Sequence, residues 1–351
     1  MACSFSACKG TGNATGTGAL SIVTTIFPEY DWVKNVLGEN PGKAELTMLL
    51  DNGVDLHSYQ PTADDILKIS TCDVFVYVGG ESDEWVDDAL KEAVNKDMTV
   101  INLLEVLGDK VKEEEIVEGM EYEHDHDHDE DEDHDEEHED GDEHAEDHED
   151  EHGDEHDEDH EEGHDHDHED EEPELDEHVW LSLRNADILV DKIAAVLAEK
   201  DSANADTYKK NAADYREKLS ALDGKYKEVV SGASVNTLLF GDRFPFRYLV
   251  DDYGLSYYAA FVGCSTESKA SFETIVFLAN KVDELSLRSV MTIEGPDHQI
   301  AEAIKDNTAS KDQKVLTLDS MQSTTGKDVE AGTTYLSVME QNLEVLKEAL
   351  K

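Results

Sequence analysis

The feature that most constrains this chain is a segment of 57 residues, from Glu121 to Glu177, that has almost nothing to bury. It contains 37 Asp and Glu and 13 His but no Lys or Arg, and Tyr122 and Leu175 are nearly its only apolar side chains. Burying so few apolar groups cannot offset the conformational entropy lost on ordering the backbone. The segment is therefore predicted to be disordered, and the fold must come from the sequence on either side.

The remaining sequence has the composition of a globular protein. Subtracting the 37 negative charges of the acidic segment from the formal net charge of −58 leaves −21 for the other 294 of the 351 residues. With 38% hydrophobic residues, such a chain can form two modest cores. The acidic balance argues against nucleic acid as a partner, because a polyanion would find no basic stripe, and it favours cations near the surface.

The N-terminus predicts a lipid anchor. Phe5-Ser6-Ala7-Cys8 is similar to a bacterial lipobox, in which the chain is cleaved before a Cys that then carries lipid, and Met1-Ala2-Cys3 is a weaker candidate. The Gly/Thr/Asn-rich residues that follow Cys8 suit a flexible tether, so residues 1–18 are expected to hold the protein at a membrane surface. No charged or apolar leader precedes Cys8, which suggests a signal peptide that was trimmed or not included. The alternative is a chance Cys in a disordered terminus.

The other two cysteines and the hydropathy of the sequence indicate no specific function. Cys72 and Cys264 adjoin apolar runs and are predicted to be buried free thiols. No apolar stretch approaches 18 residues, so no membrane span is expected.

Strand and helix signals alternate along the chain from Leu20. Before the acidic segment the expected strands are 20–27, 45–50, 73–80 and 99–106, and the expected helices are 29–38, 61–70 and 84–95. Strands separated by helices imply a parallel sheet covered on both faces. After the acidic segment come a helix over 179–200, a second one near 203–232, and a further α/β alternation from 236 to 351.

The helix near 203–232 is almost free of helix breakers, and about 27 helical residues would be about 40 Å long. We therefore expect an α/β fold of two lobes, each with a mainly parallel sheet flanked by helices, joined by this long rigid helix. The predicted divisions are an N-terminal lobe (19–200, including a disordered loop over 113–177), a linker helix (201–231) and a C-terminal lobe (232–351).

Only three histidines lie outside the acidic segment: His57, His178 and His298. His57 follows a predicted strand and precedes a helix, which is where open α/β sheets bind ligands. His178 stands at the start of a predicted helix. His298 is either an ordinary helix-start residue or a residue that approaches the same site.

Two of the histidines lie in motifs: His57 in residues 53–61, GVDLHSYQP, and His178 in residues 176–181, DEHVWL. These resemble the G-x-x-P-H-x-Y-x-P and D-P-H-x-W-L motifs of the cluster A-I metal-binding lipoproteins, the solute-binding proteins of zinc and manganese ABC importers. Leu318-Asp319-Ser320 matches the acidic ligand after a late strand. A His-rich acidic insertion before the second motif is the mark of the zinc-type members.

This resemblance implies one metal ion in a cleft between two lobes, held by His57, His178 and Asp319, the last from the opposite lobe. Imidazole and carboxylate ligands suit Zn²⁺, with Mn²⁺ as the alternative. The resemblance further implies an extracytoplasmic lipoprotein, not an enzyme, that delivers zinc to the membrane permease of an ABC transporter.

The sequence departs from the family at Arg243, which stands where members supply a third ligand, His or Glu. Arginine offers only donors and cannot ligate a cation. Asp242 or a histidine of the acidic segment could complete the site instead, and Glu294 could orient a His ligand. Arg243 could pair with Asp319 or Glu294, or recognise an anion bound with the metal.

The acidic segment itself has two interpretations. A charge run can be merely solvated, but His alternating with Asp at both of its ends offers many weak metal sites, with His124, His126, His128, His164, His166 and His168 as the candidates. We expect it to collect metal. Two further classes remain open: a zinc hydrolase using His57, His178 and Asp319 with an open position for water, and a pure metal buffer whose lobes are only scaffold.

Overall fold

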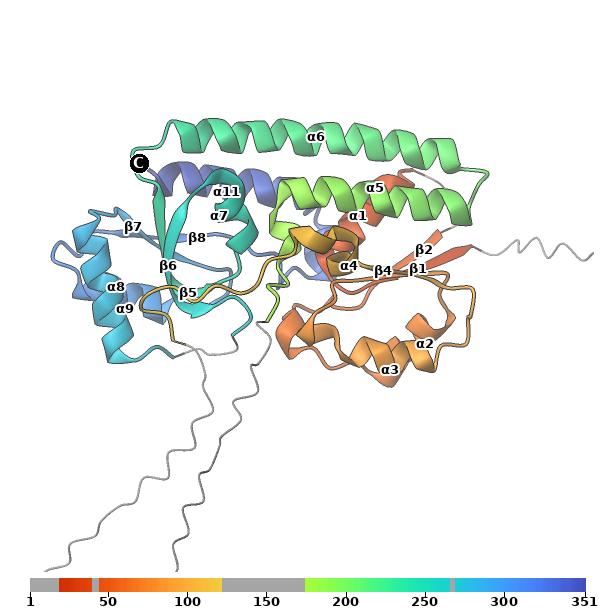
Figure 1. The fold of residues 1–351 in the computed structure, drawn as a ribbon, viewed down its shortest axis with the longest axis horizontal. Helices are drawn as coiled ribbons and strands as arrows, with labels where there is room; N and C mark the ends of the chain where they lie inside the picture. Colours follow the sequence, from red (N-terminus) through yellow and green to blue (C-terminus); the bar gives the residue numbers. More distant parts are fainter. Residues whose placement is uncertain (1–18, 40–43, 122–173, 266–268) are drawn as a thin grey trace, which may run out of the picture. The chain divides into compact units, whose positions relative to one another are not determined.

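The structure is a computed structural model that describes residues 19–39, 44–121, 174–265 and 269–351. The predicted tether, its lipidation site Cys8 and the candidate histidines of the acidic segment lie outside the described residues. The described elements form one compact unit, which is drawn in Figure 1.

The first sheet contains four parallel strands in the order β2-β1-β3-β4. Its strands are β1 (Leu20–Thr24), β2 (Ala44–Met48), β3 (Val74–Tyr77) and β4 (Thr99–Asn102). All four residues of β3 are buried, as expected for a central strand covered on both faces. The connecting helices are α1 (Phe27–Leu37), α2 (Ala63–Thr71) and α3 (Trp85–Lys91).

The second sheet repeats this arrangement with four parallel strands in the order β6-β5-β7-β8. Its strands are β5 (Thr237–Phe244), β6 (Ser256–Val262), β7 (Ser289–Thr292) and β8 (Lys314–Thr317). Its helices are α7 (Arg247–Tyr253), α8 (Phe272–Glu284), α9 (Gln299–Asn307) and α10 (Gly326–Glu330). The predicted fold class, two lobes with parallel sheets flanked by helices, is confirmed.

Three helices line one side of both sheets. The long helix α6 (Ala205–Ser231) has 27 residues and buries Leu219, Leu222 and Tyr226 on one face. Figure 1 shows α6 running along both sheets, with α5 (Leu183–Lys200) and the C-terminal α11 (Tyr335–Ala349) beneath it. No helix among the described residues is long and apolar enough to cross a membrane. Because α11 contacts α1 as well as α6, the C-terminal helix fastens one lobe to the other.

Two local predictions from the sequence are wrong. The strand expected over 99–106 ends at Asn102, whose side-chain oxygen accepts a hydrogen bond from the backbone N–H of Glu105 and so begins α4 (Leu103–Leu107). The disordered loop expected over 113–177 is too wide at both ends. Glu113 forms an antiparallel bridge with Leu175, and Glu121 forms a parallel bridge with Phe261 of β6. Backbone pairing therefore orders residues that composition alone assigned to the loop.

Candidate metal centre

His57 is held at the carboxyl edge of the first sheet by a 3₁₀ helix (Leu56–Ser58). Asp55 caps this turn, since its Oδ1 accepts the backbone N–H of His57 at 3.0 Å. Leu56 is buried and anchors the turn in the core. The His57 side chain itself is only 4% exposed, so the loop presents its imidazole inward.

His178 approaches from the segment that follows the acidic insertion. Asp176 Oδ1 accepts the backbone N–H of His178 at 2.9 Å and lies 3.1 Å from its ring Nδ1. His178 is fully buried, and its ring lies 5.2 Å from that of Trp180, measured between centroids. One carboxylate therefore fixes both the backbone and the ring of this residue.

The two imidazoles face each other. Nε2 of His57 lies 3.1 Å from Nε2 of His178. On the far side of each ring, Nδ1 is already engaged: that of His57 lies 2.7 Å from Ser82 Oγ and 3.5 Å from Glu177 Oε2, and that of His178 contacts Asp176. Tautomers with the proton on Nδ1 direct two Nε2 lone pairs at one point. Two nitrogens bound to a tetrahedral zinc would be roughly 3.3 Å apart, so this pair has the spacing that one metal ion requires.

The two rings differ in proton affinity. Burial and the neighbouring His178 together lower the pKa of His57 to about 3, although Asp55 opposes the change. Burial also acts against protonation of His178, but Asp176 and Glu177 outweigh it and raise the pKa of His178. At neutral pH the His57 ring is therefore neutral and able to donate to a metal, whereas a metal at His178 must compete with a proton.

Among the described residues, one further side chain joins this pair. The thiol of Cys264 and one ring nitrogen each from His57 and His178 all lie within 4.8 Å of one another. Both Cys72 and Cys264 are free, but only Cys72 is fully buried, and Cys264 is half-buried beside the imidazoles. Burial of the thiol and the nearby Glu114 carboxylate raise the pKa of Cys264. Cys264 lies just after the end of β6, and a position at the end of a strand is also what marked His57 as a candidate. The same feature of the sequence could have identified Cys264.

Asp319 does not belong to this group of three. It follows β8 in the second lobe, and its Oδ1 accepts the backbone N–H of Met321 at 2.8 Å. Burial and the nearby Glu294 carboxylate together raise the pKa of Asp319 to about 6. Its role as a metal ligand therefore stays a prediction.

The other candidates of the second lobe form hydrogen bonds with neighbouring residues of that lobe. Asp242 Oδ2 accepts hydrogen bonds from Thr292 Oγ1 at 2.7 Å and from the Ile293 N–H at 3.2 Å, and Thr292 Oγ1 also lies 3.0 Å from His298 Nδ1. Glu294 accepts the N–H of Ser320 at 2.6 Å and that of Gln322 at 3.0 Å, so it shapes the loop that carries Asp319. None of the three joins the paired imidazoles among the described residues.

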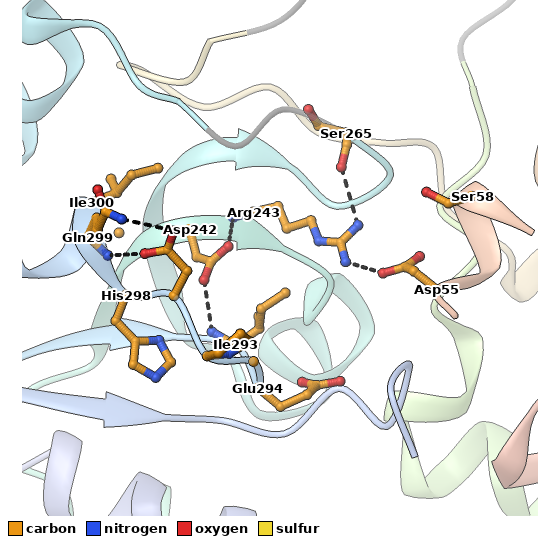
Figure 2. A pocket seen from close by; sticks show the side chains of 14 residues that line it. Asp55, Ser58, Asp242, Arg243, Ser265, Ile293, Glu294, His298, Gln299 and Ile300 are labelled. Atoms are coloured by element: carbon orange, nitrogen blue, oxygen red, sulfur yellow. Dashed lines mark hydrogen bonds and ion pairs between the residues drawn. The ribbon is translucent and has the colours of Figure 1, made fainter. Parts of the chain in front are cut away.

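Arg243 pairs with neither of its predicted partners, Asp319 and Glu294. Its Nη2 forms an ion pair with Asp55 Oδ2, and its Nη1 donates to the carbonyl oxygen of Ser265 at 3.3 Å. Figure 2 shows the guanidinium between these two groups, at one side of a pocket that Asp242, Glu294 and His298 also line. The prediction failed because Asp55 lies in the His57 loop, and the contact between that loop and β5 depends on how the lobes meet.

Sequence reasoning also missed the groups behind the imidazoles. Ser82, Asp176 and Glu177 touch the Nδ1 side of the rings, and Ser82 N–H donates to Glu177 Oε1 at 2.8 Å. Asp176 and Glu177 stand directly before His178, so acidic residues adjoining a candidate ligand were the available signal. The sequence analysis placed them in the acidic segment and in the second motif but assigned them no role in orienting the ring.

The buried carboxyl of Asp83, next to Ser82, is expected to make the stability of the folded protein depend on pH. It is 3% exposed, its Oδ1 has no hydrogen-bond partner, and burial raises its pKa to about 7. An unfolded Asp titrates near 4, so the folded protein holds this proton between about pH 4 and 7. The stability that the protonated carboxyl contributes is fully present below about pH 4 and is lost as the pH rises through 7.

We therefore expect the free energy of unfolding to fall by about 2–4 kcal/mol more in the native protein than in Asp83→Asn between pH 4 and 8. Urea unfolding of both proteins at several pH values measures the difference. Parallel stability curves would show that Asp83 is ionised in the folded protein across this range.

The two lobes with parallel sheets and the facing imidazoles of His57 and His178 form a two-lobed α/β protein with a candidate metal centre. The chain belongs to the family "Zinc-uptake complex component A periplasmic" (ZnuA), whose model matches residues 22–349.

Two curated relatives illustrate the similarity. The chain is 32% identical to the zinc-binding lipoprotein AdcA of Streptococcus pneumoniae serotype 4 over 337 residues, which are 94% of this chain and 56% of AdcA. It is 26% identical to the high-affinity zinc uptake system protein ZnuA of Bacillus subtilis over 349 residues, 99% of this chain and 93% of that protein. The chain thus spans only about half the length of AdcA.

Solved structures agree. The Zn(II)-bound ZnuA-like domain of Streptococcus pneumoniae AdcA superposes with a TM-score of 0.65 at 27% identity, covering 95% of this chain and 99% of that domain. The chain is therefore similar over its length to a structure solved with zinc bound.

Proposed function

We propose that this protein is the solute receptor of a zinc ABC importer, a lipoprotein anchored through Cys8 outside the cytoplasm that binds Zn²⁺ and delivers it to the membrane permease. The observation that carries the proposal is the facing pair of Nε2 atoms 3.1 Å apart. Membership of the zinc-uptake family and the names of the two relatives support it.

In this function zinc is the transported ion, which the protein binds and then releases to the permease. His57 and His178 are the proposed ligands, and Asp176 and Glu177 hold their rings with the donor nitrogens turned inward. Asp319 remains a proposed ligand from the second lobe. No covalent step is needed.

Burial of the rings argues against the hydrolase alternative. His178 is fully buried and the side chain of His57 is 4% exposed. A hydrolase needs an open position at which its substrate meets the metal-bound water, whereas a receptor gains from enclosing its cargo. Imidazole ligands also suit zinc better than manganese, which prefers carboxylate and water.

The acidic segment is proposed to collect metal close to this site, and its described flanks support that role. The N–H of Glu121 donates to the carbonyl of Ala260 in β6 at 2.9 Å, and the N–H of Glu114 donates to that of Glu174 at 2.8 Å. Glu114 also accepts the N–H of Cys264 at 2.9 Å. The flank before the insertion is thus attached to β6 and to the Cys264 loop, and the flank after it pairs with that first flank.

Zinc titration by calorimetry, with and without the acidic segment, tests the proposal. Residues 124–171 can be replaced by a Gly/Ser linker of about ten residues, which keeps Asp176 and Glu177 in place behind the imidazoles. A receptor should retain one tight site per chain and lose only weak binding. If nearly all binding disappears with the segment, the protein is a metal buffer.

The ion pair between Asp55 and Arg243 is expected to influence the affinity for zinc. Both charges act on His57, and Arg243 lowers its pKa while Asp55 raises it, so Asp55 offsets a positive charge that would repel the metal. We expect Asp55→Asn to weaken zinc binding by about tenfold, or about 1.4 kcal/mol, because asparagine keeps the cap on the His57 turn but not the charge.

The matched control is the double variant Asp55→Asn with Arg243→Gln, which removes both charges and should recover most of the affinity. Competition with a zinc chelator measures all three proteins. Equal affinities in the native protein and Asp55→Asn would show that the pair serves local structure alone.

A further inference from the structure

The loop that follows β6 lies against the candidate metal centre. A Cβ added at Gly263 would lie 2.9 Å from the carbonyl oxygen of Phe244 and 3.1 Å from Cε1 of His178. A side chain at this position would therefore force the loop away from the imidazole. Glycine lets the backbone come this close, and the next side chain in the chain is the thiol of Cys264.

The thiol is within reach of a metal bound to both imidazoles. The Cys264 sulfur and one ring nitrogen each of His57 and His178 lie within 4.8 Å of one another. A tetrahedral zinc with bonds of about 2.3 Å to sulfur and 2.0–2.1 Å to nitrogen separates its ligand atoms by roughly 3.3–3.6 Å. Small side-chain rotations would bring all three atoms to these distances.

Arg243 contacts both the loop of the thiol and the loop of His57. Its Nη1 donates to the carbonyl oxygen of Ser265, the residue after Cys264, and its Nη2 pairs with Asp55, which caps the His57 turn. Arg243 occupies the position at which the resemblance implies a metal ligand. It thus connects the loop of Cys264 to the loop of His57.

We propose that Cys264 is a further protein ligand of the transported metal, so that its thiolate joins the imidazoles of His57 and His178. This inference rests on the proposed function and deepens it. As the sulfur–metal bond forms, the S–H bond breaks and the proton is released to solvent; the carboxylate of Glu114, which accepts the backbone N–H of Cys264 at 2.9 Å, lies beside the thiol. A soft thiolate ligand favours zinc over manganese.

Cobalt(II) substitution tests the inference directly, because a cobalt–thiolate bond gives a near-ultraviolet charge-transfer absorption that imidazole and carboxylate ligands do not give. The protein is the full chain with Cys3→Ser and Cys8→Ser, which leaves only Cys72 and Cys264 as thiols. We expect this absorption to saturate at one cobalt per chain. Its absence from the cobalt-loaded protein would overturn the inference without any change at Cys264.

Two variants in the same background locate the thiol. Cys264→Ser should lose the charge-transfer absorption and bind zinc about 100-fold more weakly in competition with a chelator. Cys72→Ser, which removes the buried thiol beside Met98, should retain both. Retention of the absorption in Cys264→Ser would contradict the assignment.

His57→Ala separates this inference from the function on which it rests. If His57→Ala loses tight zinc binding while Cys264→Ser keeps it unchanged, only the thiolate ligand is wrong. If neither variant changes zinc affinity, the receptor site itself is wrong.

Discussion

Replacing His57 with alanine is expected to weaken tight zinc binding by more than about 100-fold while leaving the protein folded. The loss should exceed the 10- to 100-fold that follows from removing a group that only orients a ligand, because the imidazole itself donates to the metal. The fold should survive, since His57 lies in a capped loop at the edge of the sheet. Competition with a high-affinity chelator measures the affinity, and circular dichroism checks the fold.

His298→Ala is the matched control. This residue is also a histidine outside the acidic segment, but its Nδ1 contacts Thr292 in the second lobe. We expect its zinc affinity to equal that of the native protein. Tight binding that survives in His57→Ala, or falls equally in His298→Ala, would contradict the assignment of the site.

Trp180→Ala is expected to lower the free energy of unfolding by about 3–5 kcal/mol, the usual range for removing a buried aromatic side chain. Trp180 is fully buried two residues after His178, and its Nε1 donates to the carbonyl oxygen of Ser320 at 2.8 Å. Its own carbonyl oxygen accepts the Tyr335 hydroxyl at 2.6 Å. The side chain thus joins the first lobe to the Asp319–Ser320 loop and packs against the candidate ligand.

A loss of this size should lower the melting temperature by roughly 6–20 °C, which calorimetry measures. Trp85→Ala is the control, because Trp85 is only half-buried against Tyr59 and its loss should be less than half as large. Equal effects of the two substitutions would show that Trp180 does not hold the lobes together.

The sequence predicted the architecture because the responsible signals are local. Alternating strands and helices required parallel sheets, and the spacing of Leu219, Leu222 and Tyr226 predicted the long helix, where all three are buried. The strand expected over 99–106 failed because the apolar run continues past Asn102, and only the hydrogen bond from Glu105 N–H to the Asn102 side chain ends the strand.

The candidate site was predicted only in part, because its remainder depends on contacts between distant residues. His57 and His178 stood out as rare histidines at element ends, and the structure brings them together. Cys264 joins them only because β6 and its loop fold against the His178 segment. The pairing of Arg243 with Asp55 crosses 188 positions of sequence, and no spacing rule could have predicted it.

The most direct test of the receptor site is a crystal structure of the zinc-loaded protein, with anomalous diffraction collected at the zinc absorption edge. One strong anomalous peak should lie about 2.0–2.1 Å from Nε2 of both His57 and His178. A zinc peak elsewhere in the described lobes, with the two imidazoles still in contact with each other, would contradict the account.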